Sequence, residues 1–328
     1  MNNFKKIGLS ALAGSLVAVS AQAADVSLSG GASVAFTSAF DSDKTGYYMN
    51  DSVTMTISGE TDNGLTVTTS LELDGAGAAS TGSFDNRSIK IGNDEMGTVT
   101  FAGHGGDSVI GGWDDVMPTA YEEVFALTKK RADGTADGNT VIAGYSGDNL
   151  WRYDSPSIGG ASFHMAYQSA GTAAASGGTP AKVSSYSDMG IQIAPEMVEG
   201  LSIGYAVGEY DETATKSIDV STLWVKYAVG SFTVGVQESE RDGSAAADHD
   251  SSESWGVSYA VNDDFSVSYG QHTYEEGTST TEQESSGFSA SYTSGGVSIS
   301  AAFNSTDNIQ NSATDDEDSY EIAFSFAF

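Results

Sequence analysis

Residues 288–303 read FSASYTSGGVSISAAF, and apolar side chains occupy alternate positions on both sides of the turn at Ser294–Gly296. Phe288, Ala290 and Tyr292 precede this turn, and Val297–Phe303 continue the alternation after it. Successive side chains of a β-strand point to opposite faces of a sheet, so a period of two residues predicts a strand. The stretch therefore predicts an antiparallel hairpin with one apolar and one polar face.

The same two-residue period recurs along the whole chain from Asp25 onward. The composition also favours strands and turns over helices, because Gly numbers 39 and Ser, Thr, Tyr and Phe are frequent. We predict an all-β fold with sixteen strands, at Val26–Phe36, Val53–Ile57, Leu65–Leu73, Ile89–Ile91, Val99–Phe101, Trp151–Tyr153, Ala161–Tyr167, Ile191–Ile193, Leu201–Val207, Leu223–Tyr227, Phe232–Val236, Trp255–Val261, Phe265–Tyr269, Phe288–Tyr292, Val297–Phe303 and Tyr320–Phe328.

The connections between these segments alternate strictly between long and short. The long ones are 38–51, 74–85, 103–148, 170–184, 211–217, 239–252, 274–284 and 305–318, and the short ones are 61–64, 92–97, 156–160, 195–200, 229–231, 262–264 and 294–296. An even strand number with long loops at one rim and tight turns at the other is typical of outer-membrane barrels. The sequence therefore predicts a transmembrane antiparallel up-and-down β-barrel of sixteen strands.

The polar face of the predicted strands is rich in Ser, Thr and Gly, whereas acidic residues gather in the long connections. A soluble barrel fills its interior with apolar side chains, so this polar face indicates a water-filled lumen. Aromatic residues near strand ends fit the girdles that border the lipid, at Tyr167, Tyr227, Tyr259, Tyr292, Phe303 and Tyr320.

Composition excludes several classes of protein. The chain of 328 residues carries 13 Lys+Arg against 45 Asp+Glu, a formal net charge of −32. Such a surface repels phosphate backbones, so we expect no nucleic-acid partner. The absence of cysteine excludes disulfides, thiolate zinc sites and cysteine nucleophiles. No run of 18 apolar residues is present, which excludes a transmembrane helix.

The first 23 residues are typical of a secretory signal peptide. Lys5 and Lys6 form a basic start, Ile7–Val19 is apolar, and Ala21–Ala23 is a cleavage site of the small-x-small type. We expect a mature chain that begins at Ala24 and forms a single barrel domain over residues 24–328. Cleavage removes two lysines, which leaves 11 bases against 45 acids and a net charge of −34.

Two stretches resemble the general bacterial porins, and more closely those of alphaproteobacteria. Residues 152–161 (RYDSPSIGGA), followed by Tyr167, resemble a porin strand–turn–strand motif. The C-terminal alternating strand that ends in Phe328 is similar to the signal that porins present to the outer-membrane assembly machinery. The resemblance implies a homotrimer in the Gram-negative outer membrane, in which each barrel is a passive diffusion channel for small hydrophilic solutes and ions.

In that family the third long loop folds inward and narrows the pore. The matching segment here is Gly103–Asp148, the longest connection, which carries Asp107, Asp114, Asp115, Glu122 and Glu123. By strand parity Lys90 and Arg152 face the lumen, and Lys226 is a possible third base. Fixed carboxylates in a narrow aqueous pore attract cations. We therefore expect cation selectivity. The Lys129–Arg131 run is expected to return toward the outer rim.

Two alternatives to a channel stay open at this point. An outer-membrane barrel enzyme, such as a protease or phospholipase, would need a Ser–His or Asp–His pair, and a surface adhesin would use the same barrel. We expect a channel and no enzyme, and we interpret His164, which shares the lumen parity of Ser162, as a solvated wall residue. No cofactor is expected to be required. Ca²⁺ or Mg²⁺ could associate with acidic loops, for example at Asp248-His249-Asp250, and with lipopolysaccharide or other outer-membrane lipid.

Overall fold

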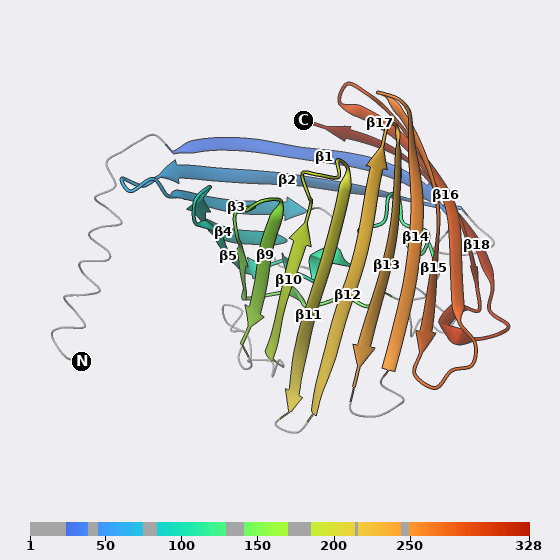
Figure 1. Cartoon of the computed structure of the whole chain (residues 1–328). Helices are drawn as coiled ribbons and strands as arrows, with labels where there is room; N and C mark the ends of the chain where they lie inside the picture. Colours follow the sequence, from blue (N-terminus) through green and yellow to red (C-terminus); the bar gives the residue numbers. More distant parts are fainter. Residues whose placement is uncertain are drawn as a thin grey trace.

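The computed structural model is a closed antiparallel barrel of sixteen strands (Figure 1). It describes residues 24–38, 45–74, 84–128, 141–169, 185–213, 216–243 and 249–328. The barrel strands are β1 (Asp25–Thr37), β2 (Gly46–Glu60), β3 (Thr66–Asp74), β4 (Asn86–Asn93), β5 (Gly97–His104), β8 (Leu150–Asp154), β9 (Ala161–Gln168), β10 (Ser185–Ile193), β11 (Leu201–Thr213), β12 (Lys216–Val229), β13 (Phe232–Asp242), β14 (His249–Asn262), β15 (Phe265–Glu276), β16 (Gln283–Ser294), β17 (Val297–Asp307) and β18 (Glu317–Ala327).

Each of the sixteen predicted segments coincides with one barrel strand, with Leu65 and Phe328 just beyond the ends of theirs, and the prediction of the fold is confirmed. Each strand pairs with its neighbour in the chain, except that β5 pairs with β8 across the longest connection. The tight turns at one rim include Gly230 (φ +59°) and Gly295 (φ +63°), positions where the left-handed backbone favours glycine. The Ser294–Gly296 hairpin has the predicted register, with Phe288 opposite Phe303.

The strands extend further toward the long-loop rim than their apolar alternation indicates. The predicted long connection at 211–217 is wrong, because β11 ends at Thr213 and β12 begins at Lys216. The polar residues of this stretch still pair, as between Asp211 and Ser217. Backbone pairing continues where the strands leave the bilayer, and no apolar face is needed there. Period counting therefore finds the part of each strand that faces lipid and misses the part in water.

The barrel closes between its first and last strands. β1 pairs with β18 in a register that places Val34 opposite Phe324. Beyond this ladder the backbone of Phe328 exchanges two hydrogen bonds with Gly30, at 3.0 and 3.1 Å. The C-terminal residue thus extends the seam that closes the sheet, and its side chain remains exposed on the surface.

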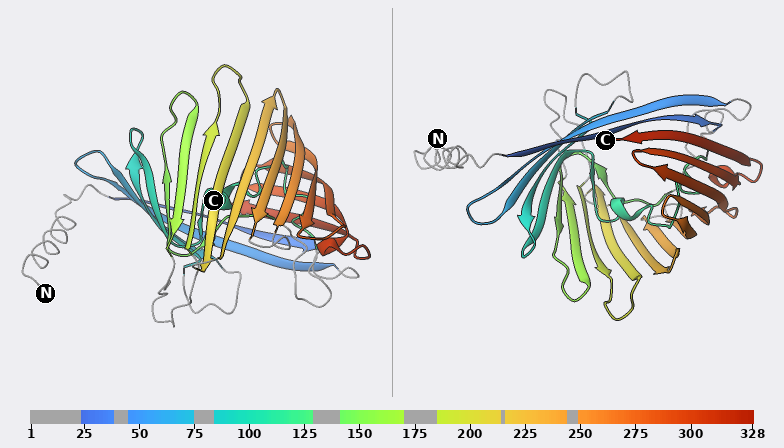
Figure 2. Two further views of the ribbon diagram at one scale, coloured as in Figure 1. Left: turned by 60° about the horizontal axis from the view of Figure 1, so that its bottom comes forward. Right: turned by 90° about the horizontal axis from the view of Figure 1, so that it is seen from above.

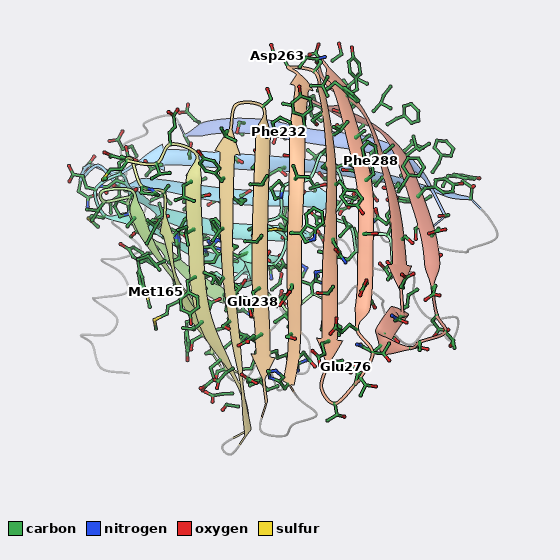
Figure 3. The ribbon with its side chains drawn as sticks, turned by 45° about the vertical axis from the view of Figure 1, so that its right-hand side comes forward. Met165, Phe232, Glu238, Asp263, Glu276 and Phe288 are labelled. Atoms are coloured by element: carbon green, nitrogen blue, oxygen red, sulfur yellow. The ribbon has the colours of Figure 1, made fainter. Side chains whose placement is uncertain are left out.

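The outer surface of the barrel is apolar toward the short-turn rim and acidic toward the other rim. Figure 3 shows Asp263 at the short-turn rim, Phe232 and Phe288 below it, Glu238 further down β13 and Glu276 near the opposite rim. The outward apolar side chains are half-exposed, which is typical of a surface in contact with lipid. Within the described residues, no helix is long and apolar enough to cross a membrane.

The main apolar cluster of the described residues lies inside the barrel, where the β5–β8 connection packs on the wall. Its members are Ala102, Val109, Ile110, Trp113, Leu150, Ala166, Tyr186, Ala206, Ile218, Val220 and Trp224. Three predictions concern residues outside the described part of the chain: the signal peptide at 1–23, the Lys129–Arg131 run, and Asp248 of the Asp248-His249-Asp250 triplet.

Candidate functional site

The site consists of the described parts of the β5–β8 connection, residues 105–128 and 141–149, which lie within the ring of strands (Figure 2, right). It contains β6 (Gly106–Asp107), the short 3-10 helix η1 (Gly111–Trp113) and β7 (Ser146–Gly147). β6 pairs with β7, so the two ends of the loop are held together where they leave the wall. We call residues 105–128 and 141–149 the inner loop.

The first part of the inner loop packs on apolar side chains of the wall. Trp113 meets Trp224 of β12 edge to face, with ring centroids 5.6 Å apart. The Ile110 amide donates to Oδ2 of Asp188 on β10 over 2.8 Å, and Gln237 of β13 donates to the Trp113 carbonyl over 2.5 Å. Together, apolar burial and charge-assisted bonding fix this part of the loop on β10–β13.

The next part of the inner loop lies against glycines of the wall. A Cβ atom at Gly235 would lie 2.6 Å from Cδ of Pro118, and one at Gly256 would lie 3.0 Å from the Pro118 carbonyl oxygen. These distances leave no room for a side chain, so the close approach of loop and wall requires glycine. Four wall glycines lie close to the loop in this way, and we call them the glycine track: Gly190, Gly235, Gly256 and Gly270.

Serine and asparagine side chains of the wall bind the loop backbone further on. The Ala120 amide donates to Oγ of Ser268 on β15 over 2.9 Å, and the Tyr121 amide donates to Oγ of Ser289 on β16 over 3.1 Å. Asn304 of β17 donates to the carbonyl of Glu123 over 3.0 Å. The loop is therefore bonded strand by strand along the wall.

A buried carboxylate fixes the loop at the seam of the barrel. The Tyr121 hydroxyl donates to Oε1 of Glu321 on β18 over 2.7 Å, and the Tyr48 hydroxyl of β2 donates to Oε2 of the same group over 2.9 Å. Glu321 is 3% exposed. A buried carboxylate with two hydroxyl donors is satisfied, and removing it leaves both donors without this acceptor.

The acidic loop residues that the sequence singled out are brought together. Burial, with the nearby carboxylates of Asp115 and Asp107, raises the pKa of Asp114 to about 6. Burial likewise raises the pKa of Glu123 to about 7, with contributions from Asp115, Glu122 and Asp114. Burial and the charge of Glu321 raise the pKa of Glu122. Each of the five acids thus interacts electrostatically with at least one of the others.

The predicted bases have different surroundings. Lys90 is exposed on the lumen side of β4, opposite Thr68 and Thr100. Arg152 donates to the carbonyls of Asp107 and Ser108 over 3.2 and 3.0 Å, so it binds loop backbone and not loop carboxylates.

Lys226 was the possible third base of the wall. It lies over the ring of Trp224, 5.1 Å from the centroid, and interacts electrostatically with Asp115. Lys226 is therefore the wall base that interacts with a loop carboxylate.

Comparisons with known proteins agree with this architecture. The family described as Gram-negative porin matches residues 8–328. The chain belongs to the Gram-negative porins. This porin is thus an outer-membrane β-barrel and a diffusion channel. No protein of curated function matches its sequence significantly.

Solved porins share its fold at low sequence identity. An anion-selective porin from Comamonas acidovorans is 16% identical with a TM-score of 0.67, over 93% of this chain and 100% of that one. OmpT of Vibrio cholerae, in a form lacking one loop, is 9% identical with a TM-score of 0.67, over 94% and 100%. A mutant porin of Rh. blastica is 14% identical with a TM-score of 0.63, over 93% and 100%.

Sequence reasoning missed the wall residues that position the loop in this porin. The lumen-facing positions of β12 hold three apolar side chains, Ile218, Val220 and Trp224. A wall in contact with water should carry polar side chains at these positions. This exception is visible in the sequence, and it indicates that the inner loop covers this part of the wall. The glycine track and Glu321 carried no comparable signal, because Gly and Glu are common throughout the chain.

Proposed function

We propose that this porin conducts small hydrophilic solutes and prefers cations. The observation that carries the proposal is the group of five loop carboxylates, Asp107, Asp114, Asp115, Glu122 and Glu123, set in the lumen against few bases. Fixed negative charge in a narrow aqueous channel concentrates cations within about one Debye length, roughly 8 Å at physiological salt. The Comamonas porin is anion-selective, so the shared fold leaves the sign of selectivity to the charges of each pore.

The reversal potential of single channels in a salt gradient tests the preference. Neutralising Asp114, Asp115, Glu122 and Glu123 together should shift it toward anion permeability. The matched control neutralises four acids at the rim, Asp315, Asp316, Glu317 and Asp318, and should change it little. An anion-selective wild type would overturn the proposal. Equal effects of the two sets would move the selectivity site to the rim.

We also propose that this porin assembles as a homotrimer, with Phe328 as part of the signal read by the outer-membrane assembly machinery. The half-exposed outer face and the position of Phe328 at the seam support both proposals. Trimers should migrate as a heat-modifiable band in detergent gels, and deletion of Phe328 should lower the yield of that band. A monomer in mild detergent at all concentrations contradicts the first proposal, and a normal yield contradicts the second.

Divalent cations are proposed as bridges between this porin and lipid phosphates. Acidic side chains lie directly opposite one another on the outer face, as in Glu209–Asp219, Glu238–Glu253 and Glu284–Asp307. Opposed like charges destabilise a sheet, and a shared Ca²⁺ or Mg²⁺ relieves the repulsion. The described residues contain no group of three or more His, Asp or Glu arranged for a metal, so lipid oxygens would complete the coordination. Lipopolysaccharide should dissociate from the purified porin in a chelator. Unchanged retention would contradict the bridge.

A further inference from the structure

Three side chains on the wall form a connected hydrogen-bond chain. Oδ1 of Asp154 lies 2.7 Å from Nδ1 of His164, and Nε2 of the same imidazole lies 2.9 Å from Oγ of Ser162. The carboxylate binds one ring nitrogen and the hydroxyl binds the other. This order of contacts is the one in which a histidine can take a proton from serine while a carboxylate holds its tautomer.

The topology of β8 and β9 brings the three residues together. Asp154 ends β8 and is directly opposite His164 on β9. Ser162 is two residues before His164, so both side chains point to the same face of the strand. That face is the lumen, as it is for Arg152 and Gln192 of the adjoining strands. The turn at 155–160 places the group near the short-turn rim.

Neighbouring groups hold the base and leave the hydroxyl accessible. Trp113 of the inner loop meets the His164 ring nearly edge to face, 5.7 Å between centroids. The His164 side chain is 13% exposed, whereas Ser162 is half-buried. Arg152 donates from Nε to Oδ1 of Asp154 over 3.0 Å. The carboxylate is therefore fixed by a residue that also binds the loop.

The ladder register places a candidate donor for a developing oxyanion beside Ser162. Gln192 of β10 lies directly opposite Ser162 in the β9–β10 ladder, on the same lumen face. Residues paired across an antiparallel ladder have Cβ atoms about 5 Å apart, which places the Gln192 amide within reach of a group bound to Ser162. Side-chain amides serve as oxyanion donors in acyl transfer.

We propose that Ser162, His164 and Asp154 form a hydrolytic site for small water-soluble esters inside the pore. It is an activity additional to diffusion, and it does not depend on the sign of ion selectivity. Because the site faces the lumen, its substrates are molecules small enough to enter the channel, such as short-acyl esters. Lipids in the surrounding bilayer are excluded by this position. His164 is then a base, in contrast to the solvated wall residue expected from sequence.

The chemistry uses water as the only co-reactant. Oγ of Ser162 forms a bond to the acyl carbon while Nε2 of His164 takes its proton, and the carbonyl oxygen becomes an oxyanion facing Gln192. The C–O bond to the alcohol breaks, and the alcohol leaves with the proton from Nε2. Water then attacks the acyl-serine and gives a proton to Nε2. The acid leaves, and Ser162 recovers its proton.

Refolded porin supplies the test, because protein refolded from inclusion bodies is free of host membrane hydrolases. The measurements are p-nitrophenyl acetate hydrolysis and the site of labelling by a fluorophosphonate probe. We expect the folded wild-type porin to hydrolyse p-nitrophenyl acetate faster than heat-unfolded protein does. We also expect the probe to label Ser162. Ser162→Ala and Asp154→Asn should each lose at least about tenfold of the excess rate.

A second Ser–His pair provides the matched control. Oγ of Ser254 lies 2.7 Å from Nδ1 of His272, but His272 is 2% exposed and lies beneath Phe125 of the inner loop. Ser254→Ala should keep the wild-type rate. All variants must show the heat-modifiable band of the folded barrel. A wild-type rate equal to that of unfolded protein, equal rates in wild type and Ser162→Ala, or label on another residue would each overturn the proposal.

Discussion

The inner wall of this porin has two regions. In both, alternate residues of each strand face the lumen, but the two regions carry different residues. Beneath the inner loop, β10–β17 present glycine at the track and serines that are buried, such as Ser268 and Ser289. On β2 and β4, lumen positions hold Thr54, Ser88 and Lys90, which remain partly or fully exposed. We call these regions the covered wall and the bare wall.

The difference shows that facing the lumen does not by itself decide which residue fits. On the bare wall any small polar side chain can meet water. On the covered wall a side chain must match a backbone that lies within van der Waals contact, or supply the hydrogen bond that the buried backbone has lost in leaving water. Substitutions should therefore be costly on one wall and cheap on the other.

The largest effect is expected from filling the glycine track. Gly235→Leu places atoms where Pro118 lies and should lift the loop into the lumen, lowering single-channel conductance. Overpacking of this kind costs about 1–3 kcal/mol, so the heat-modification temperature should fall as well. The control is Gly59→Leu on the outer face of β2, away from the inner loop, where a Cβ meets nothing within 4 Å. Wild-type conductance and stability in Gly235→Leu would contradict the covered-wall account.

Removing the carboxylate at the seam should have the next largest effect. Glu321→Ala removes the acceptor of both Tyr121 and Tyr48, and lost bonds to a charged group cost about 1.5–3 kcal/mol each. We expect noisier open-channel currents and a lower heat-modification temperature, with partial recovery in Glu321→Gln. Glu72→Ala removes a single bond from Asn86 on the bare wall and should have a smaller effect. A larger effect of Glu72→Ala than of Glu321→Ala would contradict the role assigned to Glu321.

Acidification should weaken the proposed cation preference. The pKa of Asp114 is raised to about 6 and that of Glu123 to about 7, so both lose charge as pH falls from 8 to 5. A carboxyl whose pKa is raised by folding destabilises the folded loop when ionised, so thermal stability should rise over the same pH range. In the Asp114→Asn, Glu123→Gln double variant both pH responses should flatten. A selectivity independent of pH in wild type would contradict the assignment.

The smallest effect is expected from Lys90→Gln on the bare wall. Removing this exposed cation should strengthen the cation preference slightly in about 0.1 M salt, where the Debye length is about 10 Å. The difference should vanish near about 1 M salt, where that length is about 3 Å. Reversal potentials at the two concentrations measure it. A shift that persists at high salt would mean that Lys90 acts through direct contact with the permeating ion.

The sequence by itself determined the barrel, the number of strands and which residues face lipid, because an alternation of period two is a local property of each segment. It also identified the longest connection and its acids, Asp114 and Glu123 among them, and the resemblance to porins implied that this connection folds inward. Tertiary structure alone decided where that loop lies. Its position depends on residues far apart in the chain, such as Pro118 against Gly235 and Tyr121 on Glu321. The pairing of Arg152 with loop carbonyls and the Asp154–His164–Ser162 chain arise in the same way, because atoms that meet across strands leave no periodic trace in the sequence.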